Sequence, residues 1–225
     1  MHKIFTVKEL YDLKETLAED LLSSVMYAWE ALDGIHDYVI MLGKRLSAEE
    51  YDRIAEDVWI AKTATIAKTA TIIGPTVIGK ETEVRPGAYI RGSVLVGDGA
   101  VVGNSTELKN VILFNGVQVP HYNYVGDSIL GYKSHMGAGA ITSNVKSDKS
   151  NVFVKNGEIS IDTKRKKFGA MLGDFVEIGC NSVLNPGTVV GRHTNIYPLS
   201  MVRGYVPNNS IYKNNGDICE RIEIA

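Results

Sequence analysis

The chain has 225 residues, 44% of them hydrophobic, so it is large enough to fill the core of one large domain or two small ones. Its formal net charge of −2 excludes the basic excess that nucleic acid or an anionic membrane would require. Its apolar runs fall short of the roughly 18 residues of a membrane span, its start lacks the apolar core of a signal peptide, and its two cysteines fit neither metal nor disulfide spacing, so we expect a cytoplasmic protein.

Residues 1–55 are predicted to form an N-terminal helical segment. Leu10, Leu13, Leu17 and Leu21 recur at the spacing of a helix face. One interpretation is that these helices cover the open first coil of the fold that follows, because unpaired strand edges invite aggregation. The other is that they form an arm for interaction with a partner.

Residues 56–205 carry an internal repeat of six residues, which neither a helix nor a simple strand produces. One aliphatic residue per hexad, with a turn after each short strand, predicts an all-β chain wound as a triangular prism, with three hexads in a coil. These positions give roughly seven coils, with stacked strands about 4.8 Å apart. The repeated positions are Ile60, Ile66, Ile72, Ile78, Val84, Ile90, Val96, Val102, Leu108, Leu113, Val119, Val125, Leu130, Met136, Leu172, Ile178, Leu184, Val190, Ile196 and Val202.

A glycine often follows the repeated aliphatic residue. We expect these glycines to supply turns with positive φ between the short strands. The glycines in question are Gly79, Gly97, Gly103, Gly126, Gly137, Gly173, Gly179 and Gly191.

The repeat lapses between residues 146 and 168. The stretch "NVFVKNGEISID" alternates apolar and polar residues about Asn156 and Gly157, which predicts a β-hairpin inserted into the prism. It is followed by the basic run "KRKK", Lys164 to Lys167, which is either a solvated surface or a receptor for a phosphate-bearing ligand. Residues 206–225 are predicted to form a C-terminal tail.

Two cations occupy equivalent places on adjacent predicted coils. Arg91 follows Ile90 and Lys109 follows Leu108, so the two side chains stack on one face. Because like charges that face each other repel, the pair favours an anion such as a phosphate between them. The alternative is that both long side chains extend separately into water.

His121 lies two positions beyond the repeated Val119, near a predicted corner of the prism. Stacking Val125 on Leu108 places Tyr124 beside Glu107, so the histidine has a phenol and a carboxylate nearby in addition to the two cations. A histidine in such a position is often structural. These neighbours favour a catalytic role.

The motifs "VGNSTELKN", "VPHYNYVGD", "GAGAITSN" and "GDFVEIGCNSVLNPGTVVG" resemble the acetyltransferase domain of N-acetylglucosamine-1-phosphate uridyltransferase and of archaeal sugar-1-phosphate nucleotidylyltransferases. The resemblance covers roughly residues 72–205. It implies a hexapeptide-repeat fold, which is a left-handed parallel β-helix, and a homotrimer with sites shared between subunits. It also implies acetyl transfer from acetyl-CoA to the amine of an amino sugar phosphate or a related sugar nucleotide.

The resemblance also implies roles for single residues. His121 matches the catalytic histidine of the family, while Arg91 and Lys109 match its phosphate-binding residues. Tyr124 and Asn144 match residues that contact the sugar, and Glu107 matches a carboxylate of the same motif. His135 stands at a further substrate position. Ala138 and Cys180 stand at positions that contact the coenzyme.

The sequence also departs from the bacterial type of this family. His135, Ala140, Val145 and Cys180 replace asparagine, threonine, tyrosine and serine, and Gly92 replaces a frequent proline. No glycine-rich nucleotide loop is present, so no nucleotidyl transfer is expected. The histidines lack the spacing of a zinc site, which argues against a carbonic anhydrase of this fold. A trimeric sugar-phosphate-binding protein without catalysis remains the alternative to the enzyme.

Overall fold

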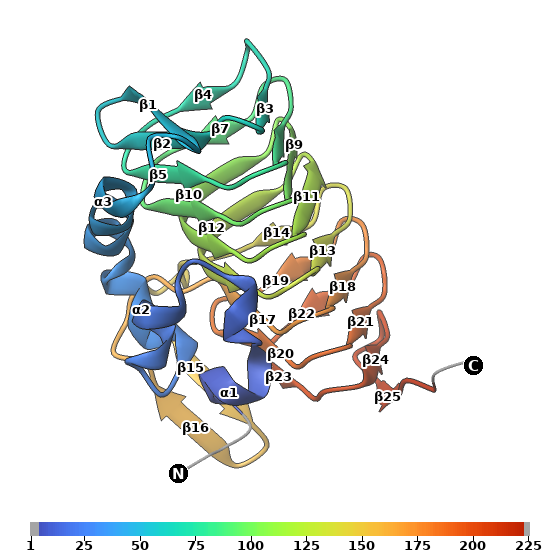
Figure 1. Cartoon of the computed structure of the whole chain (residues 1–225). Helices are drawn as coiled ribbons and strands as arrows, with labels where there is room; N and C mark the ends of the chain where they lie inside the picture. Colours follow the sequence, from blue (N-terminus) through green and yellow to red (C-terminus); the bar gives the residue numbers. More distant parts are fainter. Residues whose placement is uncertain (1–4, 223–225) are drawn as a thin grey trace.

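Most of the chain winds into a left-handed parallel β-helix, as predicted (Figure 1). The computed structural model describes residues 5–222. The three faces of the prism are named here faces 1, 2 and 3 in the order in which the chain enters them. Each repeated aliphatic residue stacks on its equivalent one coil away, as Ile60 does on Ile78 and Ile66 on Val84.

Each face is a ladder of short parallel strands. Face 1 consists of β2 (Val58–Ala61), β5 (Thr76–Ile78), β8 (Val94–Val96), the C-terminal halves of β10 (Glu107–Leu113) and β12 (Tyr124–Leu130), β17 (Ala170–Leu172), β20 (Thr188–Val190) and β23 (Tyr205–Val206). Face 2 consists of β3 (Thr65–Ile66), β6 (Glu83–Val84), β9 (Val101–Asn104), β11 (Gln118–His121), β13 (His135–Met136), β18 (Glu177–Ile178), β21 (Asn195–Ile196) and β24 (Ser210–Tyr212). Face 3 consists of β4 (Thr71–Ile72), β7 (Tyr89–Ile90), the N-terminal halves of β10 and β12, β14 (Ile141–Thr142), β19 (Val183–Leu184) and β22 (Met201–Val202).

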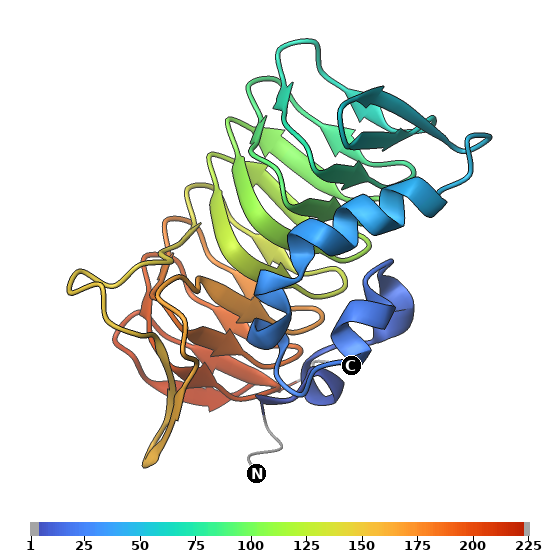
Figure 2. The same cartoon turned by 90° about the vertical axis from the view of Figure 1, so that its left-hand side faces the viewer.

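The N-terminal segment forms short helices that lie along face 1 (Figure 2). Val77, Leu95 and Ile112 precede the inward residues of face 1 and therefore point outward, yet the helices bury them fully. The helices thus cover a face of the prism, and the open edge of the first coil is covered instead by a strand, Tyr51–Ala55, which lies inside the segment that was predicted to be helical. The helices are α1 (Val7–Leu10), η2 (Leu13–Glu15), α2 (Glu19–Ser23), η3 (Ala28–Asp33) and α3 (Ile35–Arg45). Within residues 5–222, no helix is long and apolar enough to span a membrane.

Antiparallel strands, not helices, protect the two ends of the stack. β1 (Tyr51–Ala55) pairs with β2 on the first coil of face 1. At the other end β25 (Ile218–Glu220) pairs with β24 of face 2, so ordered structure continues beyond residue 205. Both strands satisfy backbone groups that an open solenoid would leave exposed.

The glycines after the repeated aliphatic residues do not serve the role expected of them. Neither Gly137 nor Gly179 has a positive φ; in these turns the left-handed residues are Gly139 and Asn181, two positions later. A Cβ on Gly179 would instead lie 2.3 Å from the backbone nitrogen of Pro198 on the next coil. Glycine is required there because adjacent coils approach each other closely, and not because of backbone conformation.

The solenoid pauses between β14 and β17, where β15 (Phe153–Asn156) and β16 (Ile159–Asp162) form an antiparallel hairpin. Gly157 has a φ of 55° in its two-residue turn. The hairpin lies beside the last coils of face 1, near β23 (Figure 1).

Candidate functional site

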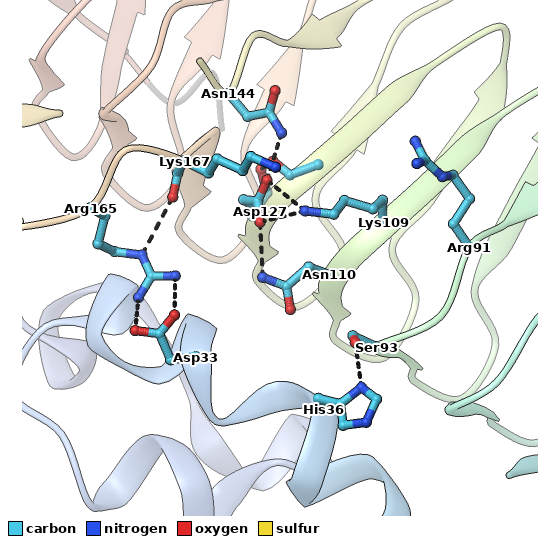
Figure 3. A network of polar contacts seen from close by, with 12 residues as sticks. Asp33, His36, Arg91, Ser93, Lys109, Asn110, Asp127, Asn144, Arg165 and Lys167 are labelled. Carbon is cyan, nitrogen blue, oxygen red and sulfur yellow. Dashed lines mark hydrogen bonds and ion pairs between the residues drawn. The ribbon is translucent and has the colours of Figure 1, made fainter. Parts of the chain in front are cut away.

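A polar network occupies the corner between faces 3 and 1, and Asp127 is its centre (Figure 3). Lys109 Nζ lies 3.1 and 3.3 Å from the two carboxylate oxygens of Asp127. Asn110 Nδ2 donates to Asp127 Oδ1 at 2.9 Å, and Asn144 Nδ2 donates to Oδ2 at 2.5 Å. The Asp127 side chain is only 3% exposed, so three donors from two other turns of the corner converge on one nearly buried carboxylate.

The strand register explains why these residues meet. Lys109 pairs with Gly126 across β10 and β12, so Lys109 and Asp127 follow equivalent strands at the same corner. Asn110 and Asp127 have φ values of 55° and 48°, in the left-handed region that asparagine and aspartate tolerate best after glycine. Neither residue was predicted from the sequence as part of the site. Their signal was available: each lies two positions after a repeated aliphatic residue, where other turns of the prism have glycine or asparagine.

Arg91, Glu107 and Tyr124 extend this network onto face 3. Arg91 Nη1 donates to Glu107 Oε1 at 2.6 Å, and Glu107 pairs with Tyr124 in the ladder, as the register of Val125 on Leu108 predicts. Asn144 Nδ2 also donates to Tyr124 Oη at 3.2 Å. Partial burial, together with the nearby Asp127 and Glu107 carboxylates, raises the pKa of Tyr124, so its phenol keeps its proton at neutral pH.

The charges of Arg91 and Lys109 are compensated within the chain. The sequence favoured an anion between the two cations, but each one is paired with its own carboxylate, Glu107 or Asp127. Repulsion between the two cations is therefore no argument for a bound phosphate.

The basic run after the hairpin comes to the same corner. A pocket there is lined by Asp33, Lys109, Asn110, Asp127 and residues 164–167, which together supply five cations and two carboxylates. Arg165 is already neutralised, because its Nη1 and Nη2 lie 2.5 and 2.7 Å from the Asp33 carboxylate of η3. Within residues 5–222 the side chains of Lys164, Lys166 and Lys167 have no ion-pair partner, so the excess positive charge of the pocket lies on this loop.

His121 lies at the opposite edge of face 3, at the corner with face 2. It ends β11, pairs with Asn104 and is exposed. Its backbone N–H donates to Asn123 Oδ1 at 3.1 Å, which holds the chain in place. Within residues 5–222 its imidazole ring forms no hydrogen bond or ion pair, so both ring nitrogens are open to a ligand.

Ala138 and Cys180 share the corner of His121 on successive coils. Gly139 N–H donates to the carbonyl oxygen of His121 at 3.0 Å, and Asn181 N–H donates to that of Ala138 at 2.9 Å. Cys180 is exposed. The catalytic and coenzyme positions named from the sequence therefore form one line along this edge.

His135 joins neither group. It points outward from β13 on face 2, and its Nδ1 lies 2.8 Å from Glu177 Oε2. The candidate residues thus fall into three sets. Arg91, Glu107, Lys109, Tyr124 and Asn144 form the networked corner, His121, Ala138 and Cys180 form the opposite corner, and His135 stands apart. In the part of the chain that the structure describes, no group of three or more His, Cys, Asp or Glu side chains could hold a metal ion.

The model of the GMPPB C-terminal domain family matches residues 72–214. The bifunctional sugar-1-phosphate nucleotidylyltransferase/acetyltransferase of Sulfurisphaera tokodaii is 32% identical over 128 residues, covering 57% of this chain and 32% of the relative. The bifunctional protein GlmU of Methanococcus vannielii is 35% identical over 133 residues, covering 59% of this chain and 32% of the relative. The chain thus spans about a third of the length of these curated relatives.

Among solved structures, one that is similar is the acetyltransferase domain of PglB from Neisseria gonorrhoeae in complex with acetyl coenzyme A. It is 19% identical with a TM-score of 0.34, and the match covers 71% of this chain and 55% of that chain.

Proposed function

The chain belongs to the GMPPB C-terminal domain family, and from this premise we propose that it is an acetyl-CoA-dependent N-acetyltransferase acting on an amino sugar phosphate or a related sugar nucleotide. The name of the Sulfurisphaera tokodaii relative includes an acetyltransferase activity, and the sequence motifs around Lys109, His121 and Asn144 resemble an acetyltransferase domain. The observation that carries the proposal is the arrangement of face 3, with a histidine ring that has no partner within residues 5–222 at one edge and a polar, basic pocket at the other.

In the proposed reaction the amine of the acceptor attacks the thioester carbonyl of acetyl-CoA. A C–N bond forms, the C–S bond breaks and the coenzyme leaves as the thiol. His121 takes the proton that the amine must lose, a role suited to an imidazole whose nitrogens carry no other partner within residues 5–222. The proton then protonates the departing thiolate.

The networked corner is proposed to hold the acceptor. The ammonium groups of the 164–167 loop, which have no ion-pair partner within residues 5–222, bind its phosphate, while the amide of Asn144 and the phenol of Tyr124 hydrogen-bond the sugar. Because the Asp127 network fixes the Asn144 amide before any ligand arrives, little ordering is needed on binding. Ala138 and Cys180 are proposed to contact the coenzyme beside His121.

We further propose a cytoplasmic homotrimer. Face 3 and its edge with face 2 carry apolar side chains that are exposed in the single chain, Tyr89 by 39%, Tyr122 by 63%, Leu199 by 72% and Met201 by 60%. A neighbouring prism would cover them and supply a second wall to the His121 edge. Both cysteines are free thiols, which suits a reducing compartment.

The test is release of free thiol from acetyl-CoA in the presence of amino sugar phosphates and amino sugar nucleotides, with the N-acetylated form of each compound as the matched control. We expect release with at least one amine and none with its acetylated counterpart. If calorimetry detects binding of an amino sugar phosphate while no compound causes thiol release, the chain is instead a sugar-phosphate-binding protein without catalysis.

A further inference from the structure

A second pocket lies between the β15–β16 hairpin and the last coils of the prism. It is lined by Lys146, Phe153, Lys155, Asn185, Arg203 and Tyr205, among others. Arg203 follows β22 at the same corner of the prism at which Lys109 follows the first half of β10. Four coils separate them, about 19 Å along the stack, so a single phosphate cannot contact both cations.

Close backbone contacts fix the position of the hairpin that lines this pocket. Gly187 and Gly204 have φ values of 83° and 72° and lie against the hairpin. A Cβ on Gly204 would lie 2.7 Å from the carbonyl oxygen of Lys155, and one on Gly187 would lie 2.8 Å from that of Phe153. Because Val152 and Val154 are also fully buried, the hairpin is anchored to the solenoid and its pocket-facing side chains start from a fixed backbone.

The lining of this pocket is positively charged. Its lining contains three cations and no carboxylate among residues 5–222. Lys146 has an exposed partner, Asp148, at 3.4 Å, whereas within the same described range the side chains of Lys155 and Arg203 have no hydrogen-bond or ion-pair partner. By contrast, Lys109 and Arg165 of the other pocket each have a carboxylate.

An aromatic ring stands beside these cations. Phe153 is 38% exposed at the pocket although the valines on both sides of it in the chain are buried. Unpaired cations suit phosphate oxygens, and an exposed ring at the same place suits stacking of a flat heterocyclic base. We infer that this pocket binds a nucleoside diphosphate, with Lys155 and Arg203 on the phosphates and Phe153 under the base.

The inference does not depend on acetyl transfer, and calorimetry tests it with uridine, guanosine and adenosine diphosphates, adenosine 3′,5′-bisphosphate and inorganic pyrophosphate. Arg203→Gln and Lys155→Gln are each expected to weaken nucleotide binding about tenfold. Phe153→Ala is expected to weaken binding of the nucleotides about fivefold or more while leaving the affinity for pyrophosphate unchanged. Lys68→Gln, at an exposed lysine of the first coils, is the matched control and leaves affinity unchanged.

Tighter binding of a uridine or guanosine diphosphate would identify the ligand as the nucleotide of a sugar nucleotide. Tighter binding of the adenosine compounds would identify it as the nucleotide part of the acetyl donor. Binding in the His121→Ala variant is expected to equal that of the parent, so the result is independent of catalysis. The inference is overturned if no nucleotide binds more tightly than about 1 mM, or if the Arg203 and Lys155 variants bind like the Lys68 control.

Discussion

The two edges of face 3 are built in opposite ways. At the corner with face 1, Asp127 gathers Lys109, Asn110 and Asn144 into a network that is complete without a ligand. At the corner with face 2, His121 is held only through its backbone, and its ring is left without a partner among residues 5–222. One edge is therefore organised in advance for recognition, whereas the other leaves an imidazole available for reaction.

The same comparison separates structural from functional charge. Lys109 and Arg91 each form an ion pair with a carboxylate of the same chain, so their attraction for an anionic ligand is weakened. At this corner the cations that have no carboxylate partner within residues 5–222 are Lys164, Lys166 and Lys167, which come from the loop after the hairpin.

The largest effect on stability is expected from Gly103→Ala, which tests how the His121 edge is supported. A Cβ on Gly103 would lie 1.6 Å from the carbonyl oxygen of Pro120, the residue before His121. Because backbone must move to admit it, we expect the free energy of unfolding to fall by at least about 3 kcal/mol. Urea denaturation measures this, with Gly99→Ala as a control, since a Cβ there meets no atom within 4 Å although its φ is positive. Equal stability of the two variants would show that coil contact does not hold this edge.

Asp127→Ala is expected to destabilise the fold by about 2 to 3 kcal/mol, because it leaves three donors without their common acceptor. The matched substitution at the other edge, His121→Ala, should change the free energy of unfolding by less than about 0.5 kcal/mol. Parallel urea titrations compare them. If the two variants have equal free energies of unfolding, the networked corner contributes no more to stability than the corner that carries His121.

Much of this contrast could be predicted from the sequence, because the six-residue period sets which residues stack. The six-residue period correctly predicted that Tyr124 lies beside Glu107 and that Lys109 lies next to Arg91 in the ladder. Asp127 was missed because its place depends on a left-handed turn, which the period does not describe. The packing of the helices on face 1 was also not predicted. A signal was present, because Trp59, Val77 and Leu95 add an apolar outward residue in every third hexad. Asp33 could not be predicted at the site, because 132 positions separate it from Arg165 in the sequence.

Asp33→Asn tests whether the helical segment positions the 164–167 loop. Arg165 is only 13% exposed and depends on the Asp33 carboxylate for both of its short contacts. Losing them should free the 164–167 loop and raise the KM of the acceptor about fivefold to tenfold, with kcat nearly unchanged. Asp37→Asn, at an exposed carboxylate of α3, is the control. A KM equal to that of the control would show that the loop keeps its place without Asp33.

The smallest effect is expected from Cys180→Ser, at the edge that carries His121. Cys180 is exposed, and a hydroxyl is a better hydrogen-bond donor than a neutral thiol. Turnover should therefore stay within about twofold of the parent or rise slightly. A steady-state assay measures this, and a loss of about tenfold or more would give the thiol a role of its own in the reaction.

Steady-state kinetics of His121→Ala test most directly whether His121 is the general base. We expect a loss in kcat of roughly 10² to 10⁴, an almost unchanged KM for the acceptor and an unchanged melting temperature. His135→Ala is the matched control, because His135 pairs with Glu177 on face 2 and should keep turnover within about twofold of the parent. Full acetyl transfer by His121→Ala would show that His121 is not the general base and that this histidine is part of the scaffold.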